Sequence, residues 1–163
     1  MKFLDEINEQ MGRFVRWLVL AMVLLQFAIV VLRYVFSFSS IALTELVLYF
    51  HATLIMLSAG YALLHDKHVR VDIFYSGLSE RAKTIIDICG HLFFVLPSMT
   101  VLLVMSWPSV RNSWSILEGP ISVGGIPASF YLKSLITAFS VLIIIQSVSI
   151  LIGKFRAGGA FSK

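Results

Sequence analysis

Four long apolar stretches, separated by shorter polar segments, dominate the pattern along this chain. They run roughly over residues 17–35, 42–64, 85–107 and 130–152. Each holds about 20 residues, which at ~1.5 Å rise per residue matches a hydrocarbon core ~30 Å thick. Such continuous runs lack the alternation of barrel strands, and in lipid only helices or closed barrels satisfy the backbone. The pattern predicts an all-α integral membrane protein with four transmembrane helices in one domain, residues 1–163.

The first residues predict a helix of another kind. Leu4, Ile7, Met11, Phe14 and Leu18 recur at helical spacing on one face, with charged residues elsewhere. A helix with one apolar and one charged face lies in the membrane interface. We therefore expect an N-terminal interfacial amphipathic helix that leads into the first span. The segment carries three acids and no small-residue cleavage site follows it, so it does not have the pattern of a cleaved signal peptide.

Composition supports the membrane class. Only 13% of the residues are charged and 58% are hydrophobic, with a mean hydropathy of +0.90, whereas soluble domains carry about 25% charged residues. The formal net charge of +4 is not gathered into a patch, and no nucleic-acid partner is expected. The single cysteine, Cys89, lies in an apolar run and excludes a disulfide framework.

The positions of the basic residues predict the orientation in the membrane. Ten of the 13 lie in the N-terminal segment, the second loop and the C-terminal tail: Lys2, Arg13, Arg16, Lys67, Arg70, Arg81, Lys83, Lys154, Arg156 and Lys163. The other three, Arg33, Arg111 and Lys133, lie on the opposite side. Because cytoplasmic loops carry the excess of lysine and arginine, both termini and the second loop are expected to be cytoplasmic.

Histidines raise the question of a cofactor. His51 and His91 are the two inside spans, and helix rise places them at depths that differ by roughly 8 Å in a ~30 Å core. One iron between two imidazoles needs them at nearly equal depth, so a haem fits poorly and no cofactor is expected. His65 and His68, with Asp66 and Asp72 nearby, could start a metal site, but no third group of ligands accompanies them.

Catalytic motifs do not emerge from the sequence. The serines are scattered, and no serine, histidine and carboxylate occur at a spacing that indicates a catalytic triad. Neither a GxSxG motif nor a phosphate-binding loop occurs. We therefore predict that the protein is not an enzyme.

Glu45 is an acid inside a predicted span, near the expected outer start of the second helix. A charge costs ~2.5–3.5 kcal/mol at the centre of a span and less near the interface, so it usually has a partner. Arg33, two residues from the end of the first span, is the predicted partner. Glu45 could instead couple proton or cation movement, but its shallow depth favours a structural pair.

Small and polar side chains form stripes on two of the predicted helices. The stripe residues are Glu45, Tyr49, Met56 and Gly60 on the second helix and Ser140 and Ser147 on the fourth. Such side chains allow close approach and hydrogen bonding between membrane helices. Packing within the four-helix unit explains any one of them, but together they point in several directions. We expect a second, larger membrane partner to use the surplus.

The loop between the third and fourth spans is long for a hairpin and is expected outside. Its aromatic residues suit the headgroup region, and its glycines and prolines fix turns. We predict a docking surface that includes Trp114, Glu118, Gly124, Gly125 and Pro127. An interfacial cover is the alternative.

The marks of an autonomous transporter are missing from the sequence. The two halves show no internal repeat, and no ring of charges occurs. Pro97 predicts a kink in the third span, which neighbouring helices can tolerate. We therefore predict an accessory subunit, a class of protein that does not require these features.

Three motifs together resemble a known family. "LRYVF", "TELVLYFHATLIMLSAGYALLHDKHVRVDIF" and "ILEGPISVGGIPASFYLKSLI" are similar to the small membrane subunit, DctQ-like, of tripartite ATP-independent periplasmic (TRAP) transporters. The most specific part is HVxVD, with His68, Val69, Val71 and Asp72, after an acid-bearing second helix. The family often has a second acid or a tryptophan around Glu45, which this chain lacks.

The resemblance implies a role in a heteromeric secondary transporter of a bacterial inner membrane. A periplasmic solute-binding protein would deliver an organic acid or related solute to a large membrane subunit driven by an ion gradient, with sodium as the expected ion. The small subunit would brace the large one among the membrane lipids and help to dock the binding protein, and the HVxVD loop would set topology. Two rivals stay open: a small proton-coupled multidrug exporter that uses Glu45, and a haem-bearing electron-transfer subunit.

Overall fold

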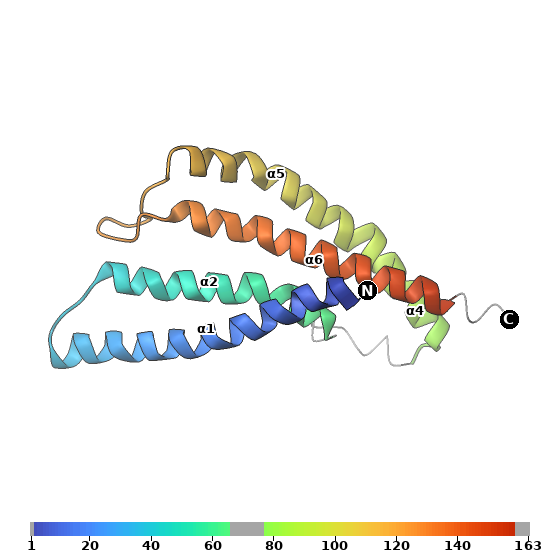
Figure 1. The fold of residues 1–163 in the computed structure, drawn as a ribbon, viewed down its shortest axis with the longest axis horizontal. Helices are drawn as coiled ribbons and strands as arrows, with labels where there is room; N and C mark the ends of the chain where they lie inside the picture. The colour runs from blue at the N-terminus through green and yellow to red at the C-terminus, as the bar shows by residue number, and fades with distance from the viewer. Residues whose placement is uncertain (1, 66–76, 159–163) are drawn as a thin grey trace.

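The computed structural model describes residues 2–65 and 77–158, most of which are helical (Figure 1). The helical segments are α1 (Lys2–Val35), α2 (Ile41–Leu64), α4 (Glu80–Cys89), the π-helical η1 (Gly90–Val95), α5 (Leu96–Ser115) and α6 (Ser129–Gly158). Four stretches are long and apolar enough to cross a membrane: Leu4–Val35, Ile41–Leu64, Arg81–Ser115 and Ser129–Phe155. This confirms the prediction of an all-α protein with four candidate spans. His68, Val69, Val71 and Asp72 lie outside the described residues.

The first span and the segment before it form one helix. α1 continues for 34 residues from Lys2 to Val35 without a break. The amphipathic segment is therefore helical, but it extends the span instead of standing apart from it. Its location in the membrane interface stays a prediction.

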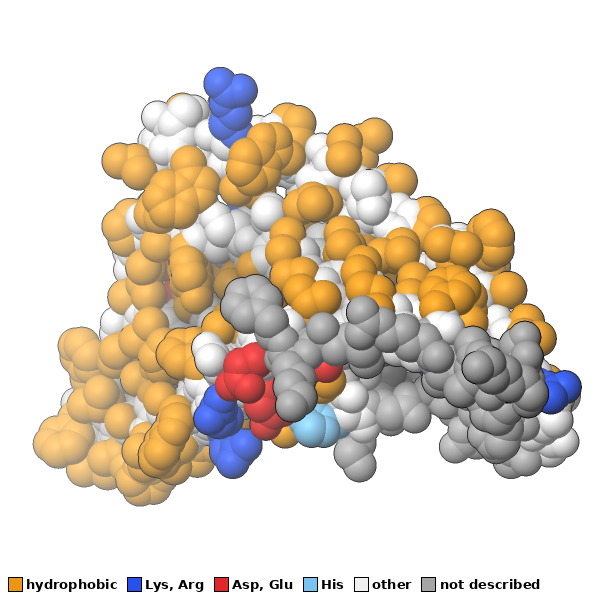
Figure 2. Space-filling model, turned by 45° about the vertical axis from the view of Figure 1, so that its right-hand side comes forward, with side chains coloured by type: hydrophobic (Ala, Val, Ile, Leu, Met, Phe, Trp, Pro, Cys, Tyr) orange, Lys and Arg blue, Asp and Glu red, His pale blue; other side chains and the backbone are white. Residues whose placement is uncertain are grey.

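The helices are arranged in an open layer. In Figure 1 their order across the layer is α1, α2, α6, α5, with α1 and α5 at opposite edges. α1 packs on α2, α2 on α6 and α6 on α5, and α1 also reaches α6. The apolar window of the fourth span is 44% buried, whereas none of the third-span window is buried. α6 is thus the central helix, and much of the apolar surface faces outward, as Figure 2 shows for one face.

The third span bends along its length (Figure 1). It joins α4, η1 and α5, and the Leu96 N–H donates to the carbonyl of His91, the wider spacing of a π-helix. Pro97 follows directly and has no N–H to donate, and Pro108 lies further along α5. Proline removes a helical hydrogen bond and crowds the preceding turn, so the two prolines account for the irregular course.

Candidate functional site

The loop between α5 and α6, residues 116–128, is attached to α2 by the side chain of Glu45. The backbone N–H of Ser122 donates to Glu45 Oε1 at 2.9 Å, and that of Ile126 donates to Oε2 at 2.7 Å. Gly125 lies so close to the carboxylate that a Cβ there would overlap it. The acid therefore organises the loop through main-chain donors, and glycine is needed at the point of closest approach.

An aromatic layer lies directly beneath this attachment. The Tyr49 hydroxyl donates to the Ile126 carbonyl at 3.4 Å, and the Tyr49 and Tyr131 rings stack with centroids 6.1 Å apart. Thr53 Oγ1 donates to the Tyr49 carbonyl at 2.7 Å, and its oxygen lies 2.9 Å from the Tyr131 hydroxyl. Because the Thr53 proton is already used, Tyr131 donates to Thr53. Tyr49, Thr53 and Tyr131 thus join α2 to α6 below the loop.

The start of the loop is held by an ion pair. Lys133 Nζ lies 2.5 Å from Glu118 Oε2, and the Ser113 hydroxyl donates to the same oxygen. The hydrogen bond from Lys133 is the main reason that the pKa of Glu118 lies below its usual value, followed by that from Ser113. Ser129 Oγ donates to the Gly119 carbonyl at 2.5 Å. The end of α5 and the start of α6 are thus linked through this segment.

The residues predicted to form the docking loop have different surroundings. Trp114 is the last-turn tryptophan of α5; its Nε1 donates to Ser134 Oγ at 2.7 Å, and its ring packs on Phe130 with centroids 4.6 Å apart. Glu118 and Gly125 make the contacts described above, whereas Gly124 and Pro127 are exposed. Gly124 has φ +82°, a conformation that favours glycine. Docking to a partner stays a prediction.

A second polar cluster lies toward the other end of the layer, between α1 and α6. Asn8 Nδ2 donates to Gln146 Oε1 at 3.0 Å, and Asp5 accepts from Gln146 Nε2 at 3.3 Å and from Ser149 Oγ at 2.6 Å. Asn8, Gln146 and Ser149 are all buried. The Asn8 amide also faces Gly60 of α2. Sequence reasoning missed Asp5 and Asn8 as packing residues. The available signal was Asn8, a polar residue at helical spacing from Leu4 and Met11 on the predicted apolar face, whereas Asp5 gave none.

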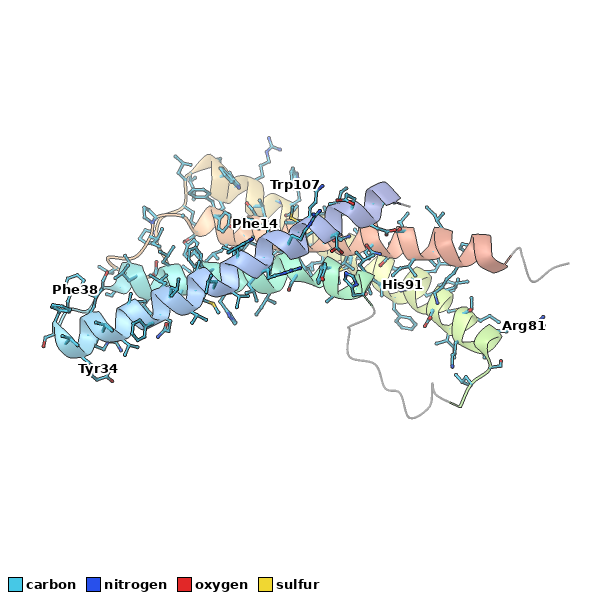
Figure 3. The ribbon with its side chains drawn as sticks, turned by 60° about the horizontal axis from the view of Figure 1, so that its bottom comes forward. Phe14, Tyr34, Phe38, Arg81, His91 and Trp107 are labelled. Carbon is cyan, nitrogen blue, oxygen red and sulfur yellow. The ribbon has the colours of Figure 1, made fainter. Side chains whose placement is uncertain are left out.

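Further polar contacts connect residues that are distant in the chain. His65 Nε2 lies 3.0 Å from Glu9 Oε2, and Lys154 Nζ lies 2.5 Å from Asp87 Oδ2. His91, labelled in Figure 3, has its Nδ1 3.2 Å from the hydroxyl of Ser147. These contacts join α1 to α2 and the third span to α6.

The small and polar residues predicted to form stripes on the second and fourth spans are mainly buried. Glu45, Tyr49, Gly60, Ser140 and Ser147 are buried, and Met56 is half-buried. The described contacts of the five buried residues are made within the layer, which is the packing role that the sequence left open. Contact with a partner stays a prediction for this set.

The structure does not join Arg33 to Glu45. Both line one surface pocket together with Ser122, but among the ion pairs of the described residues none links their side chains. Backbone donors take the place that the sequence assigned to arginine. His51 lines a different groove, between α1 and α2, and no three or more His, Cys, Asp or Glu side chains converge within residues 2–65 and 77–158.

Comparison with known proteins assigns a family to this arrangement. Residues 22–157 match the family model of the tripartite ATP-independent periplasmic transporters, DctQ component. A search of curated proteins found no match. The matched region includes residues 22–35 of α1 and all of α2, α4, η1 and α5, and it extends into the last turn of α6. The chain therefore belongs to the DctQ family, the small membrane subunits of TRAP transporters.

Proposed function

We propose that this chain is a non-catalytic brace for the large membrane subunit of a TRAP transporter. The observation that carries the proposal is the open layer of helices (Figure 1). A transport path must be surrounded by protein so that polar groups are shielded from lipid. One layer, ordered α1, α2, α6, α5, has two broad faces and surrounds nothing, but it can support a second membrane protein laid against it.

The outer loop supports the second part of the proposal, docking of the periplasmic solute-binding protein. Glu45, Tyr49 and Glu118 hold the loop in one shape through α2 and α6. A loop fixed in advance loses less entropy when it binds a partner. Sodium coupling, an organic acid substrate and the bacterial inner membrane belong to the same proposal, and they rest on the family resemblance.

The exporter rival gains no support from the surroundings of Glu45. A coupling carboxylate must release and accept protons or cations, whereas both Glu45 oxygens accept backbone N–H groups. Such donors stabilise the ionised form and fix its position. Glu45 therefore serves the loop better than it would serve a transport cycle.

The experiment is purification of the tagged chain from its own host membranes in a mild detergent, with mass spectrometry of the co-purifying proteins. We expect one much larger multi-span protein at a ratio close to one to one. A lone homodimer that transports solutes after reconstitution would contradict the proposal. Loss of that transport in Glu45→Gln would then identify an exporter.

A further inference from the structure

α2 carries one exposed stripe along an otherwise covered surface. Its exposed positions between residues 41 and 55 are Ile41, Thr44, Leu48, His51 and Ile55, and they follow one another at alternate steps of three and four. This 3.5-residue spacing keeps side chains on one line that faces a neighbouring helix, as in left-handed helix pairs. We name these five residues the α2 stripe.

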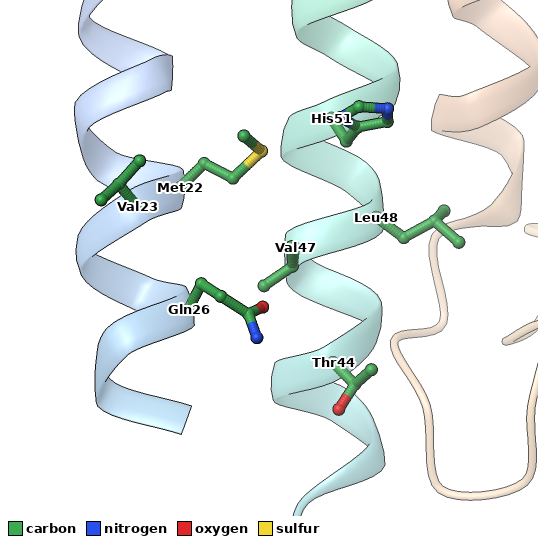
Figure 4. A pocket seen from close by; sticks show the side chains of 7 residues that line it. All are labelled: Met22, Val23, Gln26, Thr44, Val47, Leu48 and His51. Carbon is green, nitrogen blue, oxygen red and sulfur yellow. The ribbon is translucent and has the colours of Figure 1, made fainter. Parts of the chain in front are cut away.

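The stripe borders a groove between α1 and α2. Met22, Val23 and Gln26 line the groove from α1, and Thr44, Val47, Leu48 and His51 line it from α2 (Figure 4). Most of the lining is aliphatic, with the Gln26 amide and the His51 imidazole as the large polar groups. The groove is therefore an apolar surface depression that contains two strong hydrogen-bonding groups.

Both polar groups lie near the middle of the membrane. Gln26 stands nine residues before the end of α1 at Val35, and His51 ten residues after the start of α2 at Ile41. At ~1.5 Å per residue each is roughly 14–15 Å from the outer end, the centre of a ~30 Å core. The two groups thus share one depth.

Neither group has a hydrogen-bond partner within the part of the chain that the structure describes. Both side chains are exposed. Thr44 differs, since its hydroxyl donates to the Ser40 carbonyl at 3.2 Å. Lipid tails offer neither donors nor acceptors, so an amide and an imidazole exposed there are costly unless another polar group reaches them.

We propose that a transmembrane helix of the large transport subunit lies along the α2 stripe and hydrogen-bonds Gln26 and His51 through a polar side chain of its own. The inference rests on the proposed function and names the face that the partner covers. Acyl chains would fill the aliphatic groove but would leave both polar groups without partners. A helix supplies apolar ridges for the groove and a polar side chain at its centre.

Adjacent positions on α1 allow a matched test of the face. Val23 lines the groove and Leu24 does not, yet their exposed fractions are 55% and 59%. Their side chains leave the helix in directions that differ by ~100° about its axis. A photo-crosslinking amino acid is placed at each in turn, in cells that contain the complete transporter, and the crosslinked peptides are sequenced.

At position 23 we expect crosslinks to a predicted transmembrane helix of the large subunit, at several times the yield obtained at position 24. Equal yields at the two positions would overturn the assignment of the face. Crosslinks at position 23 only to lipid, or to a second copy of this chain, would overturn the proposal that a helix of the large subunit occupies the groove.

The hydrogen bonds are tested with Gln26→Leu and His51→Leu, singly and together, and with His51→Asn to keep a polar group. Hydrogen bonds between membrane helices correspond to roughly 3- to 15-fold in association. We expect each leucine variant to lower binding of the large subunit by about that factor, with partial recovery in His51→Asn. The thermal stability of the isolated chain should not fall, because neither side chain has a hydrogen-bond partner among residues 2–65 and 77–158.

Unchanged binding in the double leucine variant would overturn the inference while leaving the proposed function in place. Failure of the unmodified chain to bind any large subunit would instead remove the proposed function. Loss of thermal stability in the isolated leucine variants would show an internal role and would also overturn the inference.

Discussion

Glu45 shows how an acid in a membrane span can be stabilised without a basic side chain. The insertion cost predicted a partner, and Arg33 was the obvious one in the sequence. The structure gives Glu45 two backbone donors instead, from Ser122 and Ile126, 77 and 81 residues away in the chain. A hydrogen bond to a charged acceptor is about twice as strong as a neutral one. The acid therefore determines the shape of the loop.

Substitution at Glu45 should loosen the loop at residues 116–128. Glutamine has one acceptor oxygen, which can keep one of the two contacts, but it turns an NH₂ group toward the other backbone donor, so that contact is lost and becomes repulsive. We expect Glu45→Gln to increase protease cleavage between residues 116 and 128 by at least roughly fivefold, the factor for a lost net hydrogen bond of ~1 kcal/mol. The measurement is limited proteolysis of the purified chain in detergent.

Two glycines of the same loop provide the controls. Gly125→Ala would push the carboxylate away from its donors, so it should increase cleavage as Glu45→Gln does. Gly119→Ala meets nothing within 4 Å and should leave cleavage unchanged. Equal cleavage of all three variants and the original chain would mean that the carboxylate does not hold the loop.

Among the helices, α2 and α6 depend on close contact near the Asn8–Gln146 cluster. A Cβ at Gly60 would lie 2.9 Å from Asn8 Cγ and 3.1 Å from Leu142 Cβ. The three helices α1, α2 and α6 meet at this point. Small residues let membrane helices approach in this way. The buried polar cluster, in turn, gives the contact one defined register.

Gly60→Ala should therefore destabilise the packing of the helices. Overpacking a well-filled contact costs about 1–3 kcal/mol, and here the Asn8 amide would have to leave Gln146. Gly90→Ala is the matched control, because it lies in a helix with nothing within 4 Å and should be neutral or about 0.5–1 kcal/mol stabilising. Reversible unfolding in mixed micelles measures both variants, and similar free energies of unfolding would contradict the contact.

At the scale of the whole molecule, the open layer separates two kinds of surface. The inner contacts are polar and specific, as at Asn8 and Tyr49, whereas the outer surfaces are mainly aliphatic and aromatic. A chain with this division holds its own shape and presents large faces to other components of the membrane. This is the form expected of a subunit that supports another.

Orientation in the membrane is also a property of the whole chain. Because ten of 13 basic residues flank one side, we expect both termini to be cytoplasmic and the loop at 116–128 to be periplasmic. A reporter active only outside should work when inserted after Gly119 and fail when fused after Lys163. The opposite pattern would place the Glu45 cluster inside the cell and remove the docking proposal.

Much of this protein could be predicted from its sequence. The four spans follow from apolar runs long enough to cross a bilayer, and the disturbance at Pro97 follows from its missing N–H. These features depend on neighbours in the chain and on the solvent, so local pattern suffices. The importance of Glu45 was also visible, because a charge in a span is costly wherever the helix lies.

The partners of these residues were decided by tertiary structure. Arg33 lay closer to Glu45 in the sequence, but the donors come from a loop between the third and fourth spans. Asn8 was assigned to an interfacial helix, yet it is buried against Gln146, 138 residues away. Which faces of α1 and α2 stay uncovered likewise depended on the order of helices in the layer. Hydrophobic pattern determines that a helix spans the membrane, whereas only the packed arrangement determines which polar groups meet.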